Sequence, residues 1–362
     1  MKILIDINHP AHVHYFKNMI RIMRKEGHEF LVISRNKEIE HYLLTKESIS
    51  FVNRGEGSNS LKGKIVYFFY AIYFLIKQVK KFKPDVVISF GTPYPAITAW
   101  LFRNPHISFN DTEHAKLHHL LTDAFSKFIL TPSCYTKDLG EKQIRFDGYM
   151  ELCYLHPNYF VPDSSVLSML KVNKDQQYVI VRFVSWNAAH DVGQTGLTLE
   201  KKREIVYKLS KRVKVFISSE GELPEDLIKY QINIPPEKMH DALAFASLFI
   251  GEGATMASEC AVLGTPAIYV NSLEVGYCTD EETKYKLVYG FRNSNGVLEK
   301  AIELLKEKGL KNKFQIRRKK LLNDKIDVTA FMVWFVKNYP LSVKIMKERP
   351  DYQDRFRYNK RH

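Results

Sequence analysis

The chain has few cysteines, and none of them follows a pattern that would make cysteine a structural or metal-binding residue. The 362 residues include only Cys134, Cys153, Cys260 and Cys278, with no CxxC pair and no metal-ligand spacing. Disulfide scaffolds and zinc modules depend on such patterns, so the sequence argues against both classes. We expect reduced thiols and no metal site.

Three further signals are missing. Met1 leads directly into the apolar strand-like run 2–6, without the basic and apolar regions of a cleavable leader, so we expect a cytoplasmic protein. The run 57–65 has the wrong glycine spacing for a phosphate-binding P-loop and lacks Ser or Thr after Lys64. No nucleic-acid-binding signature accompanies the net charge of +14. Anionic lipid and anionic small substrates are therefore the preferred partners of this basic chain, and nucleic acid is the least favoured.

One apolar run is too short to span a membrane. Residues 65–76 are twelve apolar or aromatic residues with lysines on both sides, whereas a spanning helix needs ~20. The segment fits an interfacial helix, with tyrosines at the headgroup level and lysines on anionic lipid. It equally fits a helix packed under a sheet with lysines extending from its ends. The sequence leaves both alternatives open.

The first half of the chain alternates apolar strands with helical stretches. Asn8 is a possible helix cap, Pro10 suits a first turn, and Gly27 suits a helix end. Such alternation predicts a parallel sheet covered by helices on both faces. The expected strands are residues 3–7, 29–34, 50–53, 85–90, 106–109 and 128–131.

The second half repeats the same kind of unit after a proline-containing segment, 155–163, which we interpret as a hinge. The repetition predicts an N-terminal Rossmann-like domain at 1–160 and a C-terminal Rossmann-like domain at 161–325, whose acceptor and donor roles are implied only by the resemblance described below. Helices and a basic tail at 326–362 would pack back across the cleft. Two facing doubly wound domains bring the carboxyl ends of their strands to a shared ligand site. The expected strands are 178–183, 213–218, 231–234, 248–250 and 267–270.

The most informative stretch for function is Gly253–Glu259. It follows an apolar strand with a glycine turn and opens a short helix. Free backbone N–H groups and the positive end of the helix dipole make such a turn a seat for phosphate. Glu259 lies one turn into the helix, where its carboxylate can point back toward a ribose. Taken alone, the stretch also fits an ordinary strand-to-helix connection.

Together with residues 236–243 and the exit Leu263–Pro266, this stretch resembles the donor-site segment of GT-B glycosyltransferases. The parallels are the N-acetylglucosaminyltransferase that makes lipid II and the non-hydrolysing UDP-N-acetylglucosamine 2-epimerases. Over nearly its whole length the chain resembles the domain of unknown function 354 family of predicted glycosyltransferases. The segments that carry this resemblance are 6–13, 182–186, 189–193, 217–220 and 255–259.

The resemblance implies a donor half-site in the second domain. Glu259 would bind the ribose hydroxyls of UDP, and the backbone around Gly253, Thr255 and Met256 would hold the diphosphate. Arg182 would bond a phosphate or, alternatively, form a domain-interface ion pair. The remaining candidate substrate-binding residues are Ser185, Ser219 and His240, for the last of which a capping or surface role is the alternative.

On the acceptor side the relatives carry a histidine after the first strand, within a glycine-rich motif. Here the glycines are missing and His12 takes the matching position, where an imidazole can act as general base. His9 and His14 are interpreted as structural. Glu113 is predicted to orient His12 or to bind acceptor, and Asp111 to cap the following helix. Although residues 111–113 imitate a DxD metal motif, GT-B enzymes use helix dipoles and basic groups instead.

These features predict a metal-independent GT-B glycosyltransferase without a cofactor. It would move a sugar from a nucleotide donor, expected to be UDP-linked, to an acceptor in surface-polysaccharide or glycolipid synthesis, and could lie on the inner face of the membrane. A sugar-nucleotide 2-epimerase and a non-catalytic membrane-surface or nucleotide-binding protein are the alternatives. The relatives' Gln-rich sugar-reading segment is replaced by residues 271–277, and their glycine-serine phosphate loop by 182–187, so the sugar stays open.

Overall fold

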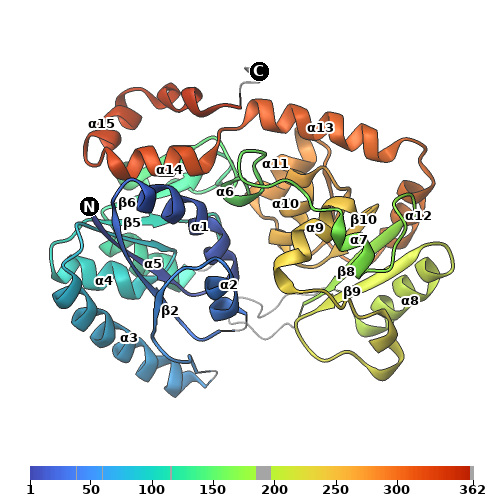
Figure 1. Cartoon of the computed structure of the whole chain (residues 1–362), viewed down its shortest axis with the longest axis horizontal. Coiled ribbons are helices and arrows are strands. Elements are labelled where there is room, and N and C mark those ends of the chain that lie inside the picture. The colour runs from blue at the N-terminus through green and yellow to red at the C-terminus, as the bar shows by residue number, and fades with distance from the viewer. Residues whose placement is uncertain (38, 59, 115, 185–196, 359–362) are drawn as a thin grey trace. The chain divides into compact units, whose positions relative to one another are not determined.

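The computed structural model describes residues 1–37, 39–58, 60–114, 116–184 and 197–358 (Figure 1). The chain forms two compact units. Unit 1 comprises Met1–Tyr154 and Lys325–Tyr358, and unit 2 comprises Leu155–Asp324. The boundary between them falls at the start of the segment interpreted as a hinge. The C-terminal helices belong to unit 1, although they follow unit 2 in the sequence.

Unit 1 is built on a parallel sheet with the strand order β3-β2-β1-β4-β5-β6-β7. The interior strand β1 is apolar at Ile3, Leu4 and Ile5, which are fully buried because both sheet faces are covered. The strands are β1 (Lys2–Ile7), β2 (Glu29–Ser34), β3 (Phe51–Asn53), β4 (Val86–Phe90), β5 (His106–Phe109), β6 (Phe128–Pro132) and β7 (Gln143–Phe146).

Helices cover both faces of this sheet. One layer contains α1, against which α2 and the C-terminal helix α14 pack, and the other contains α3, α4 and α5 in sequence (Figure 1). Asp327 caps α14 by accepting a hydrogen bond from the backbone of Ala330 at 2.9 Å. The helices are α1 (Pro10–Lys25), α2 (Glu40–Lys46), α3 (Leu61–Phe82), α4 (Pro93–Leu101), α5 (Lys116–Phe125), α6 (Leu152–Leu155), α14 (Val328–Lys337) and α15 (Leu341–Glu348), with the 3-10 turns η1 (Gly140–Lys142) and η4 (Pro350–Phe356).

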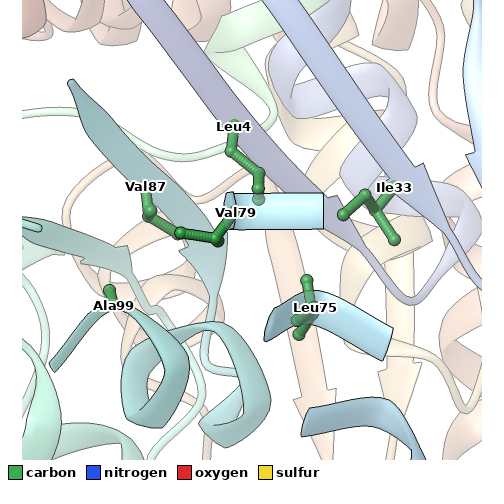
Figure 2. Packing of buried hydrophobic residues seen from close by; sticks show 6 residues of the cluster. All are labelled: Leu4, Ile33, Leu75, Val79, Val87 and Ala99. Atoms are coloured by element: carbon green, nitrogen blue, oxygen red, sulfur yellow. The ribbon is translucent and has the colours of Figure 1, made fainter. Parts of the chain in front are cut away.

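Helix α3 packs one narrow stripe against the sheet. Leu75 and Val79 meet Leu4, Ile33, Val87 and Ala99 in a buried cluster (Figure 2). On α3 the fully or nearly buried residues recur every fourth position, as expected for one face of a helix: Tyr67, Ala71, Leu75 and Val79. The twelve-residue apolar run is therefore buried on one side only. No helix in the described ranges has the length and hydropathy to span a membrane.

Unit 2 is a smaller parallel sheet with the strand order β12-β11-β10-β8-β9. Helix α10 packs beside β10 and β11 and against α9, α11 and α13. The elements are α7 (Ser165–Met169), β8 (Tyr178–Phe183), α8 (Leu199–Ser210), β9 (Lys214–Ser219), η2 (Glu225–Tyr230), η3 (Pro236–Lys238), α9 (Met239–Phe245), β10 (Leu248–Gly251), α10 (Ala254–Leu263), β11 (Ala267–Val270), α11 (Gly276–Thr283), β12 (Val288–Phe291), α12 (Val297–Lys306) and α13 (Leu310–Asp324).

One predicted strand is wrong. Residues 231–234 make only an isolated bridge between Gln231 and Ile217 of β9. Pro235 and Pro236 follow directly, and proline has no N–H group with which to extend a ladder. The predicted alternation of strands and helices is otherwise observed, and both sheets are parallel as predicted.

Candidate functional site

In unit 1 the loop after β1 sets the position of His12. His9, rather than the predicted Asn8, caps α1, and its Nδ1 accepts a hydrogen bond from the backbone of Ala11 at 3.2 Å. His12 then lies in the first turn of α1, with its ring centre 4.9 Å from that of Phe90 and 5.9 Å from that of Tyr15. His12 is thus held between aromatic rings at the carboxyl end of the sheet.

The environment of His12 keeps its imidazole neutral. Burial lowers the pKa of His12 well below 6.5, and the positive charges of His9 and Lys37 lower it further. The backbone N–H of Asn8 points at Nδ1 from 3.4 Å, which is long for a hydrogen bond. This contact favours the tautomer that carries its proton on Nε2, so the contact must break and the proton must move to Nδ1 before Nε2 can act as a base. In the Nδ1–H form, Nε2 has the free electron pair that a general base needs.

Beneath this loop lies a fully buried ion pair that we did not predict from the sequence. Arg54, just after β3, is inaccessible to solvent and pairs through Nη1 with Asp6, the penultimate residue of β1. Its Nη2 donates to the side chain of Asn8, and its Nε donates to the hydroxyl of Tyr67 at 3.1 Å. The ring of Tyr94 lies 5.2 Å from the guanidinium. Arg54 thus ties β1, α3 and the His12 loop together.

Asn8 and Asp6 complete the cluster. The amide of Asn8 donates to Asp6 at 2.6 Å and to the hydroxyl of Thr92 at 3.1 Å. Burial raises the pKa of Asp6 from its ordinary 3.8, although the adjacent Arg54 guanidinium acts in the opposite direction. The sequence signal was an acidic residue at the end of an apolar strand. Nothing in the sequence marked Arg54 as its partner.

A second buried carboxyl lies close to the cluster. Glu40 begins α2, is fully buried, and accepts a hydrogen bond from the hydroxyl of Ser34. Its other oxygen has no hydrogen-bond partner within the described residues. Burial raises the pKa of Glu40 to about 7, and the charge of Asp6 contributes to the shift. Glu40 therefore changes its protonation near neutral pH.

The other predicted acceptor residues follow β5. Glu113 is buried and accepts hydrogen bonds from Thr136, from the backbone N–H at 3.3 Å and the hydroxyl at 3.5 Å. In the described part of the chain no hydrogen bond joins Glu113 to His12, and one oxygen of Glu113 lacks a partner. Burial, aided by the charge of Glu113, raises the pKa of Asp111 to about 7. Two buried carboxyls thus stand at this strand end, one of them poised to exchange a proton near neutral pH.

In unit 2 the glycine turn lies where the sequence placed it. Gly253 is the N-cap of α10, and no side chain accepts a hydrogen bond from the first turn of that helix within the described residues. Thr255 and Met256, both half-buried, lie in that first turn. Gly251 ends β10 opposite Arg182 of β8. A Cβ atom added to Gly251 would lie 2.9 Å from the Cβ of Arg182. The turn therefore offers the N–H groups of α10 to an anion.

Glu259 and His240 form a buried pair. The Oε1 atom of Glu259, one turn into α10, lies 2.9 Å from Nε2 of His240 on α9. Both side chains are about nine-tenths buried, at 7% and 10% exposure. The ring of Phe160 meets that of His240 edge-on at 6.2 Å. The structure thus brings together two residues that the sequence named separately.

Arg182 already has partners within unit 2. Its guanidinium donates to Ser218 at 2.7 Å and pairs with Glu220 at 2.9 Å, both at the carboxyl end of β9. Ser219, the last residue of β9, is half-buried, and Ser185 lies outside the described residues. The ion pair of Arg182 therefore forms within one unit.

Glu252, between Gly251 and Gly253, is another residue that sequence reasoning missed. It is buried, pairs with Lys202 at 2.7 Å, and accepts the backbone N–H groups of Val184 at 3.3 Å and Leu197 at 2.6 Å. Glu252 thus anchors two backbone positions beside the glycine turn. An acidic residue between two glycines after an apolar strand was the available signal. Within the described ranges, no group of three or more His, Cys, Asp or Glu side chains is placed to hold a metal ion.

Comparison with known proteins gives one family and several structural relatives. The family described as "Protein of unknown function (DUF354)" matches residues 1–338. The uncharacterized protein MJ0665 of Methanocaldococcus jannaschii is 27% identical over 283 residues, covering 74% of this chain and 81% of that protein.

Solved structures resemble this chain along nearly its full length. The S. aureus MnaA–UDP co-structure is 12% identical with a TM-score of 0.69, covering 94% of this chain and 97% of that one. The UDP-GlcNAc 2-epimerase of Neisseria meningitidis bound to UDP-GlcNAc is 12% identical with a TM-score of 0.68, covering 96% and 99%. The spinosyn rhamnosyltransferase SpnG, complexed with spinosyn aglycone, is 11% identical with a TM-score of 0.60, covering 93% and 100%. The predicted GT-B fold is thereby confirmed.

Proposed function

Because this chain belongs to the DUF354 family and has the fold shared by GT-B glycosyltransferases and UDP-GlcNAc 2-epimerases, we propose that it is a glycosyltransferase. It moves a sugar from a UDP-sugar to a hydroxyl of an acceptor used in surface-polysaccharide or glycolipid synthesis. The observation that carries the proposal is in unit 2. Helix α10 begins at the glycine turn, with Gly253 as its N-cap, and its Glu259 pairs with the buried His240 of the neighbouring helix α9.

The donor half-site is assigned to unit 2. The diphosphate accepts hydrogen bonds from the N–H groups of the first turn of α10, whose dipole offsets part of its charge. Glu259 accepts hydrogen bonds from the ribose hydroxyls, and His240 holds the carboxylate in place from 2.9 Å. Arg182 stands at the end of β8 and shares its charge between Glu220 and a phosphate oxygen.

The acceptor half-site is assigned to unit 1, with His12 as general base. Nε2 of the neutral ring takes the proton of the acceptor hydroxyl while its oxygen attacks the anomeric carbon of the sugar. The bond between that carbon and the diphosphate oxygen breaks, and UDP leaves with the bonding electrons. The low pKa of His12 means that the base is unprotonated at neutral pH. Glu113 is assigned to acceptor binding, through the oxygen that is not hydrogen-bonded to Thr136.

The protein acts without a metal or an organic cofactor in this proposal. Helix α10 and Arg182 supply the positive field that a metal supplies in DxD enzymes. We place it in the cytoplasm, peripheral on the inner face of the cell membrane, where a lipid-linked acceptor would be found.

A second candidate function has a specific observation in its favour. Among the structural relatives, the UDP-GlcNAc 2-epimerase of N. meningitidis has a higher TM-score than the rhamnosyltransferase. An epimerase inverts a carbon of the bound sugar nucleotide and needs no acceptor. The Asp111 carboxyl, with a pKa of about 7, is suited to such proton exchange.

Thermal shift with nucleotides tests the donor half of the proposal. Ligand that binds only the folded protein stabilises it by about 2.7 kcal/mol at 100 times its Kd. UDP and UDP-sugars should raise the Tm, whereas GDP-, CMP- and dTDP-sugars should raise it less. A Tm that no nucleotide shifts would contradict the proposal.

Incubation with UDP-N-acetylglucosamine alone separates the two candidates. A transferase without acceptor leaves the sugar nucleotide unchanged apart from slow hydrolysis, and an epimerase produces its C2 epimer. Transfer is then measured as UDP release on addition of a membrane lipid extract. Epimer formed without acceptor would replace the first candidate with the second.

A further inference from the structure

The outward face of α3 is apolar in the middle and cationic at both ends. Val66, Phe69 and Tyr73 are 69%, 66% and 56% exposed, which is unusual for residues of this size. They lie opposite the stripe of α3 that packs on the sheet through Leu75 and Val79 (Figure 2). Ile65 and Tyr70, which are also exposed, flank this face. One continuous helix surface thus carries more exposed apolar side chains than a solvated face needs.

The charges on α3 are of one sign. The helix contains no Asp or Glu, and its lysines precede and follow the apolar centre. No salt bridge within the described residues involves any of them, and Lys77 instead lies over the ring of Tyr73 at 4.4 Å. The lysines are Lys62, Lys64, Lys77, Lys80 and Lys81. Their charge is therefore open to an anionic partner.

We propose that this face of α3 docks onto the surface of an anionic lipid bilayer. Tyrosine and phenylalanine prefer the level of the headgroups, and lysines at the helix ends reach anionic lipid. A helix of this kind lies in the plane of the interface with its apolar face buried in the headgroup region. A second copy of the chain is a poor occupant, because face-to-face contact would bring like charges together. The net charge of +14 also favours attraction to an anionic surface.

The opposite side of the same helix reaches the candidate acceptor half-site. Tyr67, on the buried stripe, accepts a hydrogen bond from Arg54, which holds Asp6 and Asn8. A helix is about 10 Å across, so the docked face lies about one helix diameter from this ion pair. Docking therefore keeps the acceptor half-site near the lipid surface. This consequence, unlike the docking itself, rests on the proposed transfer to a lipid-linked acceptor.

Vesicle flotation of the full chain tests the docking. With vesicles of phosphatidylglycerol and phosphatidylcholine in equal parts, the protein should float, and raising the salt concentration should weaken the binding. With phosphatidylcholine alone it should bind much less. A protein that stays at the bottom of the gradient with anionic vesicles overturns the inference.

Matched variants locate the surface. Lys77→Gln/Lys80→Gln/Lys81→Gln should lower the partition coefficient about 100-fold, since each lysine near an anionic surface contributes about fivefold. Val66→Ser/Phe69→Ser/Tyr73→Ser should lower it at least about 10-fold. The controls in unit 2 exchange exposed residues of the same kinds, Ile316→Ser and Lys306→Gln/Lys308→Gln/Lys319→Gln, and should float like the wild type.

Two readouts keep the outcomes separate. Circular dichroism and UDP-induced thermal shift check that each variant is folded, and flotation needs no nucleotide. If the protein floats with the vesicles but does not bind UDP, the proposed function is contradicted and the docking proposal still holds. Equal flotation of the α3 variants and the wild type would overturn the docking. So would a dimer that Phe69→Ser dissociates and that does not bind vesicles, because a second copy would then be the occupant.

Discussion

The two units use the carboxyl ends of their strands in different ways. In unit 1 the strand ends bury charges against one another, with Arg54 held by Asp6 and Asn8 beneath His12. In unit 2 the strand end opens into a glycine turn, and no side chain among the described residues caps its backbone N–H groups. The first arrangement sets protonation states and positions side chains, and the second offers a preformed seat for an anion. In the proposed function, the same architecture supports proton transfer in one unit and donor binding in the other.

The largest expected effect is on catalysis in unit 1. His12→Gln removes the proposed base and should lower kcat about 100- to 10,000-fold, the usual contribution of general base catalysis. UDP binding by unit 2 should not change. His14→Gln, on the same helix but stacked on Tyr154, is the matched control and should be close to wild type.

The pH dependence of the rate distinguishes His12 from the carboxyl pair. Because the pKa of His12 lies well below 6.5, its basic form is complete at neutral pH, and the rate should fall only on acidification. A rate that halves near pH 7 would instead point to Asp111 or Glu40, each of which has a pKa of about 7. If the His12→Gln variant had wild-type activity, His12 would not be the general base.

Removing the charge of the buried Arg54 should have nearly as large an effect, on the free energy of unfolding rather than on the rate. Arg54→Met leaves Asp6 buried beside no positive charge, and breaking such a pair costs about 3–5 kcal/mol. Chemical denaturation of the variant measures the loss. Asp6→Asn/Arg54→Met should recover part of it. The surface pair in unit 2 gives the contrast, because Arg203→Met breaks a half-exposed contact with Asp226 and should leave stability nearly unchanged.

Glu40 should make the stability of the fold depend on pH. Its pKa is about 7 in the folded protein against an ordinary 4.5, so the folded state binds the proton more tightly than the unfolded chain. The carboxyl is then neutral to stability below pH 4.5 and progressively destabilises the fold as the pH rises to about 7. Glu40→Gln should match wild type at the acidic end and exceed it by about 3 kcal/mol at pH 8.

Denaturant unfolding across this pH range tests the assignment to Glu40. The control is Glu204→Gln on α8 of unit 2, since the lysines beside Glu204 hold its pKa at about 2 and it does not titrate in this window. A constant difference between Glu40→Gln and wild type from pH 4.5 to 8 would show that Glu40 is not the titrating group.

The smallest effect concerns the donor half-site. Glu259→Gln keeps a hydrogen-bonding group beside His240 but loses the charge that strengthens bonds to ribose hydroxyls, each worth about 1.5–3 kcal/mol. UDP should bind about 10- to 100-fold more weakly by calorimetry. His12→Gln should bind UDP like wild type. If instead His12→Gln weakened UDP binding as much as Glu259→Gln, the division of roles between the units would fail.

Much of the fold followed from local patterns. Apolar runs such as 3–7 and 178–183 alternate with helical stretches, so most of the strands and the two parallel sheets were predicted, whereas β7 and β12 were not. The strand at 231–234 was wrong, because two following prolines limited its pairing to one bridge. The cap of α1 moved from Asn8 to His9, since Oδ1 of Asn8, the atom that could accept from the helix, accepts a hydrogen bond from Arg54 instead.

The candidate site was only partly visible in the sequence. Glu259 and His240 were both named, but their 2.9 Å contact joins residues of different helices. Arg54 was missed, because its partner Asp6 is 48 positions away in the chain. The roles of these residues, and those of His12 and Glu113, stay predictions until the variants are measured.

The sequence by itself determined the kind of unit, its repetition and the glycine turn before α10, because these depend on periodicity and on backbone freedom within a few residues. The tertiary structure alone decided which charges are buried together and which face of α3 is exposed. Those outcomes depend on contacts between distant segments. Whether an apolar side chain is core or surface, and whether a carboxyl is charged at neutral pH, is set by what the rest of the chain places around it.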